Sequence, residues 1–157
     1  MVKMNKYKLR ELLLIKNGRD HKHLSNGPYP VYGSGGVMRW CEEYLYDSPS
    51  ILLPRKGTLS NIQYVDQPFW TVDTTYYTEV DNTKVNTYYL FSYLQLLDLS
   101  NLNSGTGVPS MTFESYYNIE VLLPELNIQN TIATVLQIIG RKIAVNREIN
   151  RNLSLAA

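Results

Sequence analysis

The sequence predicts an α+β fold in which a β-rich domain, residues 1–125, is followed by one long C-terminal helix, residues 126–157. All 13 tyrosines lie before residue 118, among short β-branched and aromatic runs that glycine and proline interrupt, a texture typical of strands and turns. Beyond Pro124 there is no proline, and apolar residues recur at helical spacing. A chain of 157 residues, 44% hydrophobic and 18% charged, fits one globular domain with an added element and excludes disordered and collagen-like proteins.

In the β-rich part, β-branched and aromatic runs bounded by turn residues predict strands, and apolar residues at helical spacing predict short helices. The predicted helices cover residues 8–14 and 87–97. The predicted strands cover residues 50–54, 62–65, 75–80 and 117–123. The glycines around Ser34 predict a turn that approaches other backbone closely, and we expect Gly35 to adopt a positive φ there.

The long C-terminal helix is predicted to begin near Asn127, whose side chain can cap the first turn. Its apolar residues are spaced four and three apart, as in a coiled-coil seam that also contains two asparagines. This seam consists of Ile132, Leu136, Ile139, Ile143, Asn146, Asn150 and Leu153. A helix of about 28 residues would extend roughly 40 Å. It either pairs with a partner helix or projects from the domain, or it lies across its own sheet, and the sequence leaves these arrangements open.

Charge and cysteine content bear on partners and compartment. The formal net charge is only +1, but residues 1–25 hold seven basic and two acidic residues, whereas residues 40–82 hold seven acidic and two basic ones. This asymmetry suits a polyanion on one face, although charge alone favours two ordinary solvated surfaces. Cys41 is the only cysteine, which excludes an intramolecular disulfide, and no apolar run is long enough to span a bilayer. We therefore expect a cytoplasmic protein without a membrane segment.

The residue patterns of catalytic and metal centres are missing. His21 and His23 lack the two further ligands that a zinc site needs, and no HExxH or CxxC motif accompanies them. The acidic residues after Cys41 would raise its thiol pKa, and Ser34 has no identifiable base partner. The glycine clusters lack the residues of a nucleotide-phosphate loop. We therefore expect no enzyme activity, no metal and no cofactor in this chain.

Four loops, residues 19–26, 33–39, 55–61 and 103–110, combine glycine with hydroxyl, amide and basic side chains. Such groups contact phosphates and base edges in protein–DNA complexes. The same composition is typical of ordinary surface turns, and composition alone favours that interpretation.

Three blocks of sequence carry a family resemblance. The first is Tyr29–Gly36, which reads YPVYGSGG, and the second joins Ile51–Gly57 with Phe69–Thr74. The third, Leu122–Gln129, leads into the long helix. In order and spacing they resemble the target-recognition domain of type I restriction-modification specificity subunits, over nearly the whole chain. Ile128 departs from the glutamate usual in that family.

This resemblance implies a non-catalytic reader of double-stranded DNA, with the long helix as a spacer. It implies modification (methyltransferase) and restriction subunits as partners, and S-adenosylmethionine, Mg²⁺ and ATP bound by those partners. Family members carry two recognition domains and two helices, so this chain is expected to be a half-subunit, natural or a fragment, that forms a homodimer through the seam. The expected DNA contacts are Arg19, His21, Lys22, His23, Ser34, Gly35, Gly36, Arg39, Arg55, Lys56, Thr58, Ser60, Asn61, Ser104 and Thr106.

An alternative from a different class stays open at the level of sequence. The tyrosine-rich domain would then be a β-rich binding module for a protein or glycan ligand, and the helix would mediate self-association.

Overall fold

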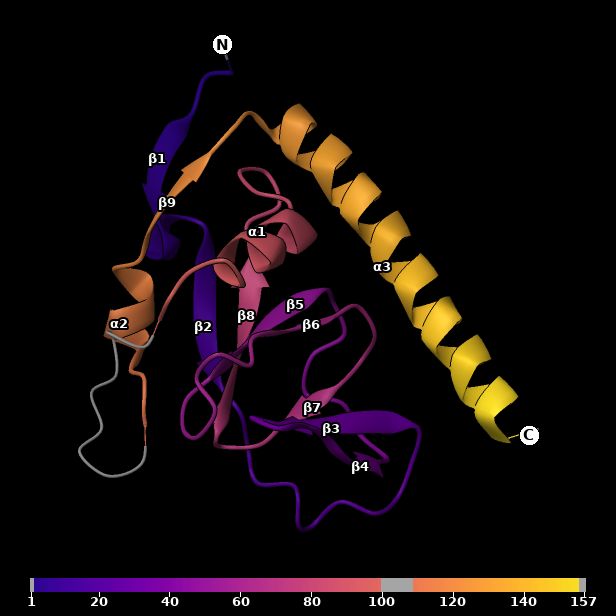
Figure 1. Cartoon of the computed structure of the whole chain (residues 1–157). Coiled ribbons are helices and arrows are strands. Elements are labelled where there is room, and N and C mark those ends of the chain that lie inside the picture. Colours follow the sequence, from indigo (N-terminus) through magenta and orange to yellow (C-terminus); the bar gives the residue numbers. More distant parts are fainter. Residues whose placement is uncertain (1, 100–108, 156–157) are drawn as a thin grey trace.

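The computed structural model describes residues 2–99 and 109–155, the last three as helix backbone only. The fold is α+β, as predicted: small sheets and short helices form a body, and the 30-residue helix α3 (Leu126–Leu155) leaves it as a rod. Figure 1 shows α3 running along one side of the body, from the level of the first and last strands to the level of β3 and β4. No helix in the described ranges is long and apolar enough to cross a bilayer.

The central sheet is antiparallel with the strand order β2-β8-β5-β6. Its strands are β2 (Leu13–Asn17), β8 (Thr75–Val80), β5 (Ser50–Pro54) and β6 (Gln63–Val65). All residues of β5 are buried, because its alternate side chains enter two different core clusters on the two faces of the sheet. The predicted strands 50–54, 62–65 and 75–80 are confirmed.

Within the described residues, a second sheet has three strands. It has the order β4-β3-β7, in which β3 (Tyr29–Gly33) pairs antiparallel with β4 (Gly36–Cys41) and parallel with β7 (Trp70–Thr71). The parallel pair joins Val31 to Trp70, two segments far apart in sequence. A separate ribbon pairs β1 (Asn5–Lys8) with β9 (Glu120–Leu123) and leads into α3.

Short helices close the body. The helix α1 (Thr87–Leu94) confirms a helix from residue 87 but ends three residues before the predicted boundary at 97. It is capped by the Asn86 side chain, which accepts from the Tyr89 backbone N–H. The helix α2 (Phe113–Tyr117) is capped in the same way by Thr112. The main core lies between the central sheet and these helices, and its largest fully buried side chain is that of Tyr116.

The helix predicted at residues 8–14 is wrong. Residues 9–11 form one 3-10 turn, η1 (Leu9–Glu11), between β1 and β2. Leu13 and Ile15 are buried while Leu14 is exposed, which is the period of two of a strand that pairs with β8. The apolar cluster that resembled a helical face is therefore shared between two consecutive elements.

Two element boundaries also differ from the prediction. The strand predicted at 117–123 begins only at Glu120, because Tyr117 ends α2. Asn127 is not the N-cap, since α3 already begins at Leu126 and the Glu125 carbonyl accepts the first helical hydrogen bonds. The Asn127 side chain instead accepts from the adjacent Ile128 N–H at 2.8 Å.

The helix α3 contacts the body with a polar and small-residue face. Gln129 and Ala133 are buried, and Gln129 donates to the Pro124 carbonyl and accepts from the Asn86 N–H. The apolar seam points elsewhere: Ile139 and Ile143 are 48% and 46% exposed. The helix therefore does not lie across its own sheet with its apolar face inward. Ile132, Asn146 and Asn150 are also exposed, Leu136 is half-buried, and the Leu153 side chain lies outside the described residues.

Candidate nucleic-acid interface

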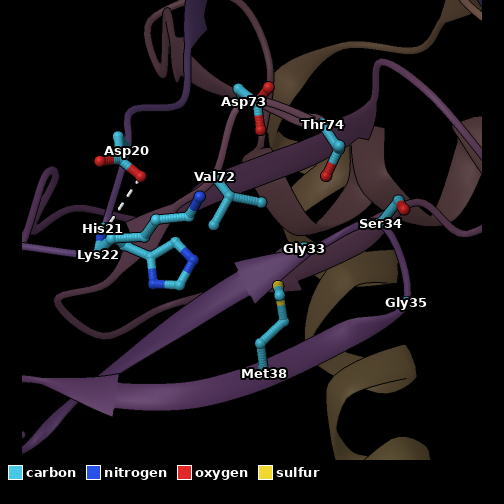
Figure 2. Close-up of a pocket in the computed structure, with 10 residues that line it drawn as sticks. All are labelled: Asp20, His21, Lys22, Gly33, Ser34, Gly35, Met38, Val72, Asp73 and Thr74. Carbon is cyan, nitrogen blue, oxygen red and sulfur yellow. Dashed lines mark hydrogen bonds between the residues drawn. The ribbon is translucent and has the colours of Figure 1, made fainter.

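Three chain segments surround one surface pocket with a volume of about 590 Å³. We name them the 19–24 loop, which follows β2, the 33–36 turn between β3 and β4, and the 72–75 turn between β7 and β8. Figure 2 shows Asp20 and Lys22 on one side of the pocket, Ser34 on the other, and Asp73 with Thr74 beside it. The remaining lining residues are His21, Gly33, Gly35, Met38 and Val72.

The 19–24 loop is held against the second sheet by main-chain contacts. The Arg19 N–H donates to the Thr71 carbonyl at 2.8 Å, and the Trp70 indole donates to the Arg19 carbonyl at 3.0 Å. The guanidinium of Arg39 donates to the Leu24 carbonyl at 2.8 Å and to the Asn26 side chain at 3.2 Å. Arg39 thus anchors this loop from β4. The His23 ring packs edge-on against Trp70 at 6.2 Å between centroids.

The 33–36 turn is supported by side chains from the 55–61 loop and from β6. The Asn61 amide donates to the Ser34 carbonyl at 2.6 Å, and the Gln63 amide donates to the Gly33 carbonyl at 3.1 Å. The glycine with positive φ in this turn is Gly36, at 118°, and not Gly35 as predicted. A side chain at Gly35 would meet open space. The predicted glycine turn exists, but its strained position is one residue later.

The 72–75 turn is fixed from both sides. Its Val72 N–H donates to the Tyr32 carbonyl, and its Thr75 N–H donates back to the Val72 carbonyl, both at 3.0 Å. The Thr74 carbonyl accepts from the N–H groups of Arg55 and Lys56, at 2.9 and 3.3 Å. Four main-chain hydrogen bonds therefore hold a turn of four residues between two sheets.

A second pocket of about 340 Å³ lies next to this turn and is lined by Arg55, Lys56 and Tyr76, among others. The Arg55 guanidinium lies 6.0 Å from the centre of the Tyr76 ring and donates to the Asp73 carbonyl at 3.3 Å. Burial raises the pKa of Tyr76, and the charge of Arg55 opposes this shift. The Lys56 side chain is exposed.

The structure brings several of the expected DNA contacts together and assigns others a supporting place. His21, Lys22, Ser34 and Gly35 line the first pocket, and Arg55 and Lys56 line the second. Arg39 and Asn61 hold loops in place. Arg19, His23 and Gly36 lie on the segments around the first pocket. Thr58 and Ser60 instead line a separate pocket together with Leu94 at the end of α1. Ser104 and Thr106 lie outside the described residues.

The basic residues of the N-terminal quarter do not all reach this face. Lys6 pairs with Glu120 at 2.7 Å on the β1–β9 ribbon, and Arg10 pairs with Glu114 at 2.6 Å beside α2. These ion pairs, formed with residues from the C-terminal part of the body, involve two of the seven basic residues of segment 1–25 and none of the acidic residues of segment 40–82.

Metal-ligating side chains are not clustered in the described part of the chain. No group of three or more His, Cys, Asp or Glu side chains there is arranged to hold a metal ion. Cys41 is buried, and burial raises the pKa of its thiol, which keeps it protonated near neutral pH.

Sequence reasoning did not select Gln63, Asp73 or Thr74. The sequence held two signals for Asp73 and Thr74: they end the Phe69–Thr74 block of the family resemblance, and they are polar residues directly after the apolar Val72. Their place beside the 19–24 loop depends on the parallel pairing of β3 with β7, which no local pattern reveals.

The family model described as type I restriction modification DNA specificity domain matches residues 1–155 of this chain. The chain belongs to this family.

Named specificity subunits are similar to this chain in sequence or in structure. A putative type I specificity subunit of Mycoplasma pneumoniae is 26% identical over 83% of this chain and 46% of its own length. The crystal structure of the S subunit of a type I restriction-modification system from M. genitalium superposes with a TM-score of 0.79 at 17% identity, covering 96% of this chain and 43% of that one.

A second solved structure comes from work on complex assembly and conformational transition of the type I restriction-modification system. It superposes with a TM-score of 0.69 at 14% identity, over 90% of this chain and 39% of that one. These likenesses to solved structures show the fold. The chain spans less than half the length of each of these three relatives.

Proposed function

We propose that this specificity domain binds double-stranded DNA in a sequence-dependent manner through the face formed by the 19–24 loop, the 33–36 turn, the 72–75 turn and the 55–61 loop. One observation carries the proposal: segments that the sequence marks separately as candidate contacts converge around adjacent pockets, on backbones fixed by hydrogen bonds. Rigid loops of this kind hold base-reading groups in place at little entropic expense.

The available side chains suit both parts of DNA recognition. Lys22 and Lys56 make no hydrogen bond or ion pair with other described residues through their side chains, and both are exposed. They would contact phosphates, which position a protein on the duplex. The hydroxyl, imidazole and carboxylate groups at the pocket would contact base edges.

The chain would act as the non-catalytic specificity component of a type I system in the cytoplasm. It would direct N6-adenine methyltransferase and restriction subunits to their site, and those partners would bind S-adenosylmethionine, Mg²⁺ and ATP. Each of the relatives is more than twice as long as the part that this chain covers, so a complete arrangement would include a second recognition domain.

The second domain would come from another copy of this chain. The exposed seam of α3 leaves Ile132, Ile139 and Ile143 in contact with water over a third to a half of their surface. Antiparallel pairing of two α3 helices would bury this stripe, at about 25 cal/mol per Å², and would place the recognition domains at opposite ends of the rod. The DNA site would then consist of two identical half-sites in inverted orientation.

The test is fluorescence anisotropy of the full chain with a pool of duplexes, at several salt concentrations. We expect binding that weakens steeply with salt, because each phosphate contact releases counterions, together with enrichment of one motif on repeated selection. Binding without salt dependence, or binding of a glycan or protein instead, would favour the alternative of a β-rich binding module. Light scattering decides the oligomeric state, and a monomer at micromolar concentration contradicts the homodimer.

A further inference from the structure

The 72–75 turn separates two groups of basic side chains. Asp73 and Thr74 line the first pocket together with Lys22 (Figure 2). Arg55 and Lys56, whose main-chain N–H groups donate to the Thr74 carbonyl, line the second. The turn therefore forms a fixed ridge in the middle of the face to which we assign DNA binding.

The ridge presents a carboxylate. The side chain of Asp73 is exposed, and none of the ion pairs within the described ranges includes it. The nearby Arg55 guanidinium donates to the Asp73 main-chain carbonyl at 3.3 Å rather than forming an ion pair with the carboxylate. Asp73 thus keeps its acceptor oxygens available although cationic residues lie on both sides of its turn.

A carboxylate in this position has a restricted choice of partners on DNA. It is an acceptor only, and phosphates repel it. Among base edges in the major groove, the groups that offer it a hydrogen bond are the exocyclic amino groups, N4 of cytosine and N6 of adenine. The basic side chains beside the turn would supply the phosphate attraction that offsets the repulsion of Asp73.

We propose that Asp73 is a specificity-determining residue, whose carboxylate accepts a hydrogen bond from the amino group of a cytosine or adenine in the major groove. This inference rests on the proposed function. It adds a named contact at a position that the loop composition of the sequence did not select, and its strength is that the turn is fixed by four main-chain hydrogen bonds.

The experiment compares the wild-type chain with Asp73→Ala and Asp66→Ala, because alanine, unlike asparagine, leaves no acceptor oxygen. Asp66 is a matched control, because it is also an exposed carboxylate outside the ion pairs of the described residues, but it lies at a pocket bordered by α3. Each full-length protein selects from a pool of duplexes with a randomised centre, the bound DNA is sequenced, and affinity for the unselected pool is measured separately.

We expect the wild-type motif to contain one base pair at which Asp73→Ala loses discrimination by roughly 5- to 150-fold. A C·G pair at that position assigns the contact to N4 of cytosine, and an A·T pair assigns it to N6 of adenine. The affinity of Asp73→Ala for the unselected pool should stay equal or rise, because a negative charge has been removed near phosphates. Asp66→Ala should select the wild-type motif.

One outcome would overturn the inference while leaving DNA recognition in place: Asp73→Ala selects the wild-type motif with undiminished discrimination at every position, whether or not its overall affinity changes. If the wild-type chain enriches no motif at all, the proposed function itself fails. Thermal unfolding checks that the variant is folded, and Asp73→Gly, which also lacks an acceptor side chain, repeats the test if the alanine variant does not fold.

Discussion

Beyond the paired residues of β5 and β8, the hydroxyl of Thr78 on β8 bonds to the main chain of Ile51 on β5 in place of a main-chain pair. The 72–75 turn leads into β8, and β5 leads into the 55–61 loop. The Thr78 hydroxyl accepts from the Ile51 N–H and donates to the Ile51 carbonyl, both at 3.0 Å. Reciprocally, the Ser50 hydroxyl donates to the Thr78 carbonyl at 2.8 Å and accepts from the Thr78 N–H at 2.9 Å. All three residues are fully buried.

Replacing Thr78 by Val retains the shape of the side chain but leaves the Ile51 N–H and carbonyl without these partners in a dry environment. Each unsatisfied buried group destabilises the folded state by about 1–3 kcal/mol. We therefore expect Thr78→Val to lower the free energy of unfolding by about 2–5 kcal/mol. For a domain of this size, this corresponds to a melting temperature lower by roughly 5–15 °C.

A matched control lies on the same strand. Thr75 is also fully buried, but its hydroxyl has no hydrogen-bond partner among the described residues. Removing that hydroxyl in Thr75→Val should leave stability unchanged or raise it, since no bond is lost and a polar group is no longer desolvated. Thermal and urea unfolding followed by circular dichroism measures both variants. Equal losses in the two variants, or a loss below about 0.5 kcal/mol in Thr78→Val, would refute the reasoning.

Three further predictions concern the proposed interface and the helix. Lys22→Ala should weaken binding to every duplex about equally and reduce the slope of log affinity against log salt by roughly one in anisotropy titrations; a loss confined to one sequence would make Lys22 a base contact instead. Ile139→Asp should convert a dimer into a monomer in light scattering, because it places a charge in the apolar seam; a dimer that persists has its interface elsewhere. Gly36→Ala should destabilise the fold by about 1–3 kcal/mol in urea unfolding, because a φ of 118° strains any side chain; Gly35→Ala faces open space, and an equal loss there would contradict this account.

The parts of the fold that the sequence predicts are those with strong local signals. The strand β5 is a run of apolar residues that ends at Pro54, and α1 begins directly after a capping Asn86, so both could be placed from local chemistry. The apolar run around Leu12 misled, because its residues serve a 3-10 turn and a strand that pairs with a segment more than 60 residues away. That pairing partner is a tertiary feature, which local periodicity does not contain.

The candidate site, too, was predictable only where the signal is local. Composition marks the loops correctly as rich in donors, but it does not show that the 19–24 loop meets the 72–75 turn. That contact requires Gly18, where a Cβ atom would lie 2.1 Å from the Val72 carbonyl oxygen. A glycine at the end of β2 is visible in the sequence, yet the backbone that approaches it is not.

The sequence also does not show which polar loop residue is free to contact a ligand. Arg39 and Lys22 are both basic residues in segments that the sequence marks as candidate contacts, but the Arg39 guanidinium is already bonded to the Leu24 carbonyl while the Lys22 amine extends into the pocket (Figure 2). Removing the anchor should therefore change binding by a different route from removing a contact. Loss of Arg39 would free the Leu24 end of the 19–24 loop and lower stability together with affinity, whereas loss of Lys22 would lower affinity alone. Supporting and contacting residues are equivalent in composition, and only their partners in the folded chain tell them apart.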